Sequence, residues 1–146
     1  MSTQNFSYTF TTSKSHEEVF NILIDPKKWW IGFHSETITG NSEKLNDEFT
    51  FSAGNGAHNS VQKLVELIPN KKISWEVVDS NLTFLKIPNE WTGTKINFDI
   101  STEENQTKVT STHNGLTPQF ECYEGCSNAW SQYLENLTKE LKFIEF

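Results

Sequence analysis

The chain of 146 residues contains no arginine, only two cysteines and no apolar run long enough to cross a bilayer. Arginine is the usual clamp for phosphate and carboxylate groups, and the net charge is −7. We therefore expect no nucleic-acid or nucleotide partner and no attraction to anionic membranes. A membrane-spanning helix needs roughly 20 apolar residues, so no membrane insertion is predicted. The amino terminus lacks a secretion signal, and the sparse cysteines indicate a cytoplasmic location.

Aromatic residues, in contrast, are abundant. They make up 13% of the chain, and most of them are the eleven Phe and five Trp. Such side chains supply both core volume and flat walls for apolar ligands. The length predicts a single domain over residues 1–146, which would bury roughly two-thirds of the surface of the unfolded chain.

The amino-terminal third predicts one strand and two short helices. Residues 6–10 alternate between aromatic and small polar side chains, as a half-buried strand does. Ser15 and Glu18 have the spacing of a capping box, which starts a helix. Asp25-Pro26 ends that helix and opens a second, short one that finishes near residues 29–32.

Residues 33–113 predict a meander of antiparallel strands. Apolar and polar side chains alternate clearly in residues 73–77 and 96–100. Within residues 61–68 the facing is ambiguous, because apolar side chains fall on both sides. Residues 79–92 have the composition of a longer connecting segment between two strands.

The carboxyl-terminal thirty residues predict a long amphipathic helix. Thr117 is its expected cap, and Pro118 suits the first turn. The apolar positions recur at spacings of three and four, which makes one stripe facing a sheet. This stripe consists of Cys126, Trp130, Tyr133 or Leu134, Leu137, Leu141 and Ile144.

Four short motifs accompany this order of elements. They are Ser15-x-x-Glu18-x-Phe20 followed by Asp25 to Trp30, the pair Trp75-Glu76, Thr112-His113-x-Gly115-Leu116, and Gly125-Cys126-x-x-x-Trp130-x-x-Tyr133-Leu134. With them the chain resembles the activator of Hsp90 ATPase homologue 1-like family of the START/Bet v 1-like (SRPBCC) superfamily. The resemblance spans nearly the whole chain. It implies the α+β helix-grip fold, a curved antiparallel sheet of about six to seven strands around a long C-terminal helix, with two short helices after the first strand.

The resemblance also implies a hydrophobic cavity between the sheet and the long helix. Members bind lipids, sterols, polyketides or other apolar molecules, and a minority are cyclases or hydrolases. We expect a binding protein for a small hydrophobic molecule, lipid-like or aromatic, that needs no cofactor. The alternatives are a protein-interaction module with an Hsp90-type chaperone partner and a cyclase-like or hydrolase-like enzyme, although no acid–base pair or nucleophile-and-base spacing stands out.

Candidate ligand contacts are aromatic and neighbouring side chains on the expected inner faces, concentrated between Cys122 and Trp130 of the last helix. Trp75 and Trp130 are the strongest candidates to line the cavity, because each lies on an apolar face. The adjacent Trp29 and Trp30 are expected not to point inward together. The alternative is that most of these side chains are ordinary core. The full set is Trp30, Phe49, Phe51, Trp75, Trp91, Phe98, His113, Tyr123, Cys126 and Trp130.

His113, Cys122 and Cys126 form a second candidate group. Three such ligands could hold zinc, and a thiolate near a histidine could act as a nucleophile. Neither spacing is specific, and buried thiols with a hydrogen-bonded histidine are the preferred reading. A disulfide is disfavoured, because Cβ atoms four residues apart on a helix lie about 5–6 Å apart.

Charged residues of the strands are expected to solubilise the outer face. Glu48, Glu76 and Asp99 alternate with apolar neighbours, so they should point to solvent on the convex side. The position of the Lys63 side chain is left open, because one facing of its strand would place it inside the cavity and the other on the surface.

Overall fold

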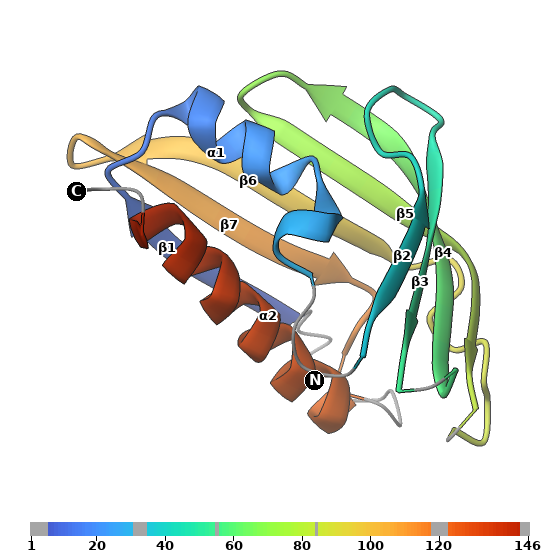
Figure 1. Ribbon diagram of the computed structural model, residues 1–146. Coiled ribbons are helices and arrows are strands. Elements are labelled where there is room, and N and C mark those ends of the chain that lie inside the picture. Colours follow the sequence, from blue (N-terminus) through green and yellow to red (C-terminus); the bar gives the residue numbers. More distant parts are fainter. Residues whose placement is uncertain (1–5, 31–34, 55, 84, 118–122, 144–146) are drawn as a thin grey trace.

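The computed structural model describes residues 6–30, 35–54, 56–83, 85–117 and 123–143, in which one antiparallel sheet curves around a long helix (Figure 1). The seven strands lie in the order β1-β7-β6-β5-β4-β3-β2. This is the helix-grip fold that the family resemblance implies. In chain order the elements are β1 (Phe6–Thr12), α1 (His16–Leu23), the 3-10 turn η1 (Pro26–Lys28), β2 (Thr37–Gly40), β3 (Glu48–Ala53), β4 (His58–Ile68), β5 (Lys72–Leu82), β6 (Lys95–Glu103), β7 (Gln106–Asn114) and α2 (Tyr123–Phe143).

The two helices after β1 form for the reasons the sequence indicates. The Ser15 hydroxyl accepts a hydrogen bond from the Glu18 N–H, and the Glu18 carboxylate accepts one from the Ser15 N–H, which completes the capping box. Asp25 caps η1 by accepting from the Lys27 N–H. The second helix is therefore a single 3-10 turn that ends at Lys28 with Trp29 as its C-cap, at the start of the expected range of residues 29–32. Residues 31–34 lie outside the described residues.

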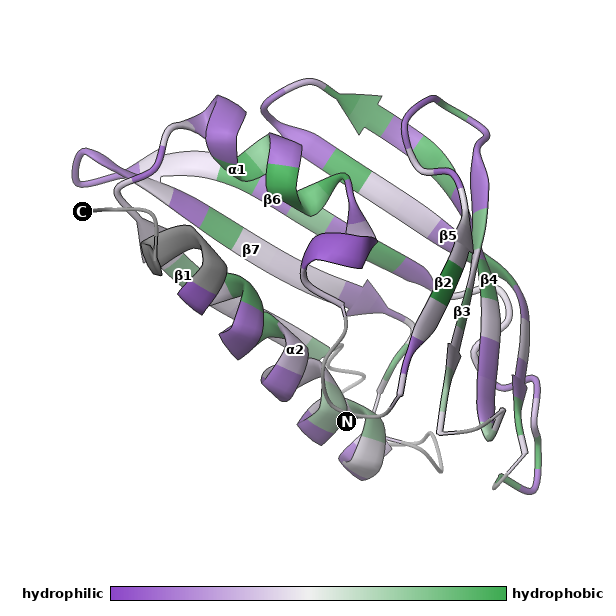
Figure 2. Cartoon of the chain, viewed as in Figure 1, coloured by the Kyte–Doolittle hydropathy of each residue, from purple (hydrophilic) through white to green (hydrophobic). Residues whose placement is uncertain are grey.

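Helix α2 places its apolar stripe on the concave face of the sheet. Trp130, Tyr133, Leu134 and Leu137 are buried there, and the opposite face of the helix is hydrophilic (Figure 2). The described helix begins at Tyr123. Residues 118–122 and Ile144 lie outside the described residues, as does the side chain of Leu141.

A β-bulge explains why the facing of residues 61–68 could not be read from the sequence. The register of β4 against β5 shifts between Leu64 and Glu66, so two residues of β4 oppose one of β5. Leu64 is fully buried before the shift, and Leu67 packs against the core after it. Lys63 pairs with Glu48 and Glu76 on the convex face, so it does not enter the interior.

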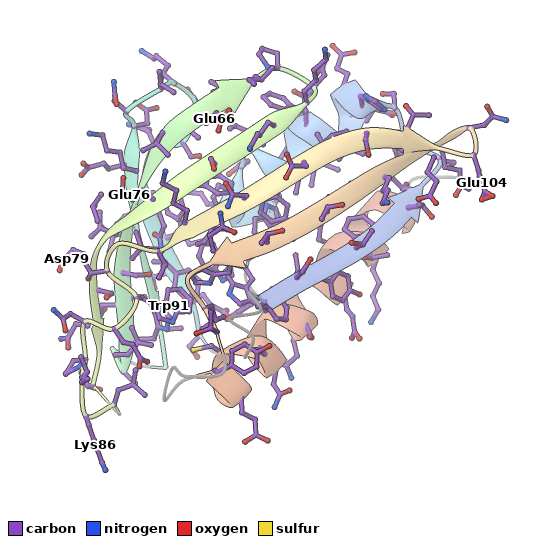
Figure 3. The ribbon with its side chains drawn as sticks, turned by 180° about the vertical axis from the view of Figure 1, so that it is seen from behind. Glu66, Glu76, Asp79, Lys86, Trp91 and Glu104 are labelled. Atoms are coloured by element: carbon purple, nitrogen blue, oxygen red, sulfur yellow. The ribbon has the colours of Figure 1, made fainter. Side chains whose placement is uncertain are left out.

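Strand β5 is longer than predicted. Residues 79–82 continue it and pair with residues 58–61 of β4, where the sequence indicated a connecting segment. The Asp79-Ser80-Asn81 run has turn-like composition, but Ser80 faces Ser60 in the ladder and both are buried. Glu76 and Asp79 lie on the outer side of the sheet (Figure 3). Glu48 and Asp99 are exposed, as predicted.

None of the helices described here is long and apolar enough to span a membrane.

Candidate functional site

A cluster of stacked aromatic rings fills the centre of the concave face. Trp30 stacks on Phe51 at 4.3 Å and on Trp130 at 4.9 Å between ring centroids. Trp29 lies parallel to Trp30 at 5.7 Å between ring centroids and meets Phe98 edge-on. Offset and edge-to-face contacts of this kind contribute beyond the area they bury. The turn after η1, strand β3 and helix α2 thus meet through their aromatic side chains.

A small pocket opens at one end of this cluster, with a volume of about 40 Å³. By comparison with the space one water molecule needs, this is room for roughly three waters. Its walls come from the turn after η1, β3, the start of β4, the β5–β6 connection and α2. We call it the aromatic pocket; it is lined by Trp30, Phe51, His58, Trp91, Cys126, Ala129, Trp130 and Tyr133.

Behind the pocket wall a chain of buried hydrogen bonds fixes two tryptophans. The Trp130 Nε1–H donates to His113 Nδ1 at 3.0 Å, so that nitrogen carries a lone pair. His113 Nε2 must then carry the proton, which it donates to the Thr94 hydroxyl at 2.8 Å. The Thr94 hydroxyl donates in turn to the Trp91 carbonyl at 2.7 Å. This chain joins α2, β7 and the β5–β6 connection.

Close backbone packing supports the same chain. Gly115 has φ +103°, and a Cβ atom there would stand 2.7 Å from Thr94 Cγ2. Only glycine fits such a backbone conformation beside a neighbour this near. The end of β7 can therefore approach Thr94 closely enough for the His113 bond.

Burial keeps the histidines of the site neutral. It lowers the pKa of His113 to about 3, with a smaller contribution from His58. Burial likewise lowers the pKa of His58 to about 4. His58 Nε2 lies 3.3 Å from the Ser60 hydroxyl, which accepts a hydrogen bond from Gln62 Nε2 at 2.7 Å. The inner face of β4 thus carries a polar chain that ends in the pocket.

Tyr133 closes the pocket beside an acidic group. Its hydroxyl donates to a Glu36 carboxylate oxygen at 2.5 Å. Burial raises the pKa of the Tyr133 hydroxyl well above its usual value, and the hydrogen bond and charge of Glu36 raise it further. The tyrosine therefore stays protonated, and the negative charge next to the pocket belongs to Glu36.

Five of the ten predicted contact residues share this pocket, namely Trp30, Phe51, Trp91, Cys126 and Trp130. The other five lie elsewhere. Trp75 and Phe98 are fully buried deeper in the core, Phe49 packs edge-on to Trp75, His113 lies behind the wall, and Tyr123 is half-buried at the start of α2.

Three lining residues were not predicted as contacts. Tyr133 belongs to the predicted helix stripe, one turn after Trp130, and that spacing could have identified it. Ala129 offers no chemical signal. His58 begins β4, and only the strand pairing shows that its ring meets Phe51 and Trp91 edge-on, at 5.3 and 4.8 Å.

The expectation that Trp29 and Trp30 could not both point inward is wrong. Both are buried, and their ring planes are 6° apart. In a regular helix or strand, adjacent side chains point in different directions. Here the backbone leaves a 3-10 turn at Trp29, and the Trp29 Nε1–H donates to the Leu23 carbonyl.

The expectation of a free Cys126 thiol is also wrong, because Cys126 is disulfide-bonded. The argument against a disulfide placed both cysteines on one helix, but the described helix begins at Tyr123. The second cysteine of the chain, Cys122, lies outside the described residues. An intact disulfide provides neither a thiolate nucleophile nor a zinc ligand. The described residues also contain no group of three or more potential metal ligands.

A second, larger hollow of about 280 Å³ lies between α1, η1 and β2. We call it the polar groove. Charged and polar residues dominate its lining, among them Asn21, Asp25, Lys27, Lys28 and Glu43. Ile24, Pro26, Ile38 and the predicted contact Phe49 also line it. Typical small-molecule sites are lined mostly by apolar side chains, so the aromatic pocket is the stronger candidate for an apolar ligand.

Comparison with known proteins agrees with the fold. The family model for activator of Hsp90 ATPase homolog 1-like protein matches residues 13–142. A solution structure of the Aha1 dimer from Colwellia psychrerythraea is 26% identical, with a TM-score of 0.73, and the match covers 94% of this chain and 96% of that one. The crystal structure of protein MLL2253 from Mesorhizobium loti is 19% identical, with a TM-score of 0.76 over 98% and 100% of the two chains.

A search of curated proteins found no match. The family match nevertheless covers most of the chain, and its extent fits the elements from α1 to α2. The chain therefore belongs to the activator of Hsp90 ATPase homolog 1-like family.

Proposed function

We propose that the protein binds a small apolar ligand, aromatic in character, in the aromatic pocket. The observation that carries this proposal is the composition of the pocket, in which three tryptophans, a phenylalanine and a tyrosine surround a solvent-connected space. Sites for small molecules are mostly apolar concavities with a few polar groups and titratable residues of shifted pKa. His58 and Tyr133 meet the last criterion.

The size of the interior favours a compact ligand over a long acyl chain. Typical ligand pockets enclose roughly 300–1,000 Å³, whereas this one holds about 40 Å³. Trp29, Trp75 and Phe98 occupy the deeper space where a lipid tail would lie. A one-ring or two-ring molecule would enter by displacing side chains at the mouth. Family membership supports the proposal, because the SRPBCC fold is often used to hold hydrophobic ligands.

Filling the pocket should abolish binding without unfolding the protein. Ala129 is half-buried on the pocket wall, so Ala129→Leu places extra methyl groups in the ligand space. Isothermal titration calorimetry with toluene, indole and acetophenone should give saturable binding to the wild type. We expect the affinity for whichever of these binds to fall at least about tenfold in Ala129→Leu, as a lost apolar contact of about 1.4 kcal/mol implies.

Asn128→Leu is the matched control, because Asn128 is exposed on the same helix turn. This variant should bind like the wild type. Absence of saturable binding to all three compounds would remove the proposal, and equal binding by Ala129→Leu would place the ligand elsewhere.

A second candidate function is modulation of an Hsp90-type chaperone. The specific support is the description of the family itself. Copurification with the chaperone and a change in its ATPase rate would establish this role, and no change in the rate at saturating protein would refute it. The Ala129→Leu variant separates the two candidates, since a surface contact with a chaperone does not need the pocket to be empty.

A further inference from the structure

We propose that the pocket selects neutral planar ligands that carry a hydrogen-bond acceptor, such as a carbonyl or ether oxygen, and that the Trp91 indole N–H is the group that recognises this atom. The inference rests on the proposed function and specifies its ligand. It assigns to Trp91 the role of specificity-determining residue.

The first observation is that the Trp91 N–H has no hydrogen-bond partner among the described residues, although it is buried. Trp29 donates to the Leu23 carbonyl, and Trp75 donates to the Ser42 hydroxyl at 3.0 Å. Trp130 donates to His113. Buried polar groups are normally paired, and one left unpaired is costly. An unpaired indole N–H beside a pocket is therefore a group for which a ligand atom can supply the partner.

The second observation is where Trp91 lies. It is 3% exposed and forms a wall of the pocket, with its ring plane only 4° from that of Trp130 at 6.3 Å between centroids. Figure 3 places it on the segment between β5 and β6, on the side of α2. Parallel indole faces suit a flat ligand.

The third observation is that Trp91 is held in place by its own backbone. Both the Thr94 hydroxyl and the Thr94 N–H donate to the Trp91 carbonyl, at 2.7 and 3.0 Å. The ring meets His113 edge-on at 4.7 Å. A donor whose position is fixed in advance loses little entropy when it binds an acceptor.

The charge of the pocket then decides which acceptors fit. None of the lining residues named for it is a lysine, and burial keeps His58 neutral. A carboxylate ligand would be buried without a counter-charge and near Glu36, which already accepts from Tyr133. Glu36 and the tryptophan faces would attract a cationic ligand, but a cation cannot pair the Trp91 N–H, whose hydrogen is the positive end of its dipole. A neutral oxygen acceptor pairs this N–H without burying a negative charge near Glu36.

Two probes of nearly equal shape test this selection. Acetophenone has a carbonyl where α-methylstyrene has a C=CH₂ group, so the pair differs in one acceptor atom. The wild type should bind acetophenone about tenfold more tightly than α-methylstyrene, the ratio that one net hydrogen bond of about 1.4 kcal/mol gives. In Trp91→Phe, which keeps an aromatic wall without the N–H, the ratio should fall to about one.

Trp75→Phe is the matched control. It makes the same truncation at a tryptophan that is fully buried outside the pocket, and it should keep the tenfold preference. In the wild type, the ¹⁵N–¹H indole signal of Trp91 should move downfield with acetophenone and not with α-methylstyrene. This readout needs no variant, so it holds even if Trp91→Phe does not fold.

The outcomes separate the two proposals. If neither probe binds, the proposed function fails and this inference fails with it. If both probes bind equally well, the pocket binds apolar ligands but Trp91 does not select an acceptor. The inference is overturned if Trp91→Phe still prefers acetophenone to α-methylstyrene. It is also overturned if acetophenone does not shift the Trp91 indole signal of the wild type. Either result would assign the selection to another group.

Discussion

Replacing Trp30 by alanine should lower the free energy of unfolding by about 3–5 kcal/mol, the range for removing a large aromatic side chain from a packed core. Trp30 is 2% exposed. It contacts Phe51 and Trp130 face to face and Phe49 edge-on, so its loss opens a cavity shared by β3 and α2. Urea unfolding followed by circular dichroism measures the change.

Leu45→Ala is the control for Trp30→Ala. Leu45 is 52% exposed, and a surface change of this kind should shift stability by no more than about 0.5 kcal/mol. A loss below about 1 kcal/mol for Trp30→Ala would mean that neighbouring rings close the gap. Trp30 would then not be the centre of the cluster.

Acidification should destabilise the protein progressively from about pH 6.5 down to the folded-state pKa values of His58, about 4, and His113, about 3. The folded state holds His113 with a pKa of about 3 and His58 with a pKa of about 4. In the unfolded chain both take up protons near pH 6.5. Because the unfolded state then binds more protons, stability falls as the pH falls, by up to about 1.4 kcal/mol per pH unit for each histidine. Urea unfolding at several pH values measures the slope.

The variant His113→Leu shows how much of the pH dependence of stability comes from His113. It leaves the Trp130 N–H without its acceptor, so it should cost about 1–3 kcal/mol at pH 7.5, and its stability should depend less steeply on pH. His16→Gln is the control, because the His16 side chain is exposed at its contact with Thr102. A wild-type stability that stays constant between pH 7 and 5 would show that His113 is not held neutral by burial.

The fold could be predicted because its signals are local. The capping box of Ser15 and Glu18, the alternation in β5 and the spacing of three and four in α2 each act within a few residues. Such patterns follow directly from the geometry of a single helix or strand. Their order along the chain then pointed to one known architecture.

The site could be predicted only in part, because it depends on contacts between distant elements. The bulge after Leu64 changes which side chains of β4 point toward the core, and no residue type in the sequence indicates this bulge. Trp91 is among the predicted contacts, but it lies in a segment whose composition indicates a loop. The position that it takes depends on the hydrogen bonds that Thr94 makes with the Trp91 carbonyl and with His113. His58 enters the pocket through the pairing of β4 with β3.

The most direct test of a ligand site in the aromatic pocket is a crystal structure of the protein grown with a mixture of small neutral aromatic compounds, including acetophenone. We predict one molecule bound between Trp30, Trp91 and Trp130, with its oxygen within hydrogen-bonding distance of Trp91 Nε1. A closed, empty pocket at saturating ligand, or a molecule bound only in the polar groove, would contradict the proposal.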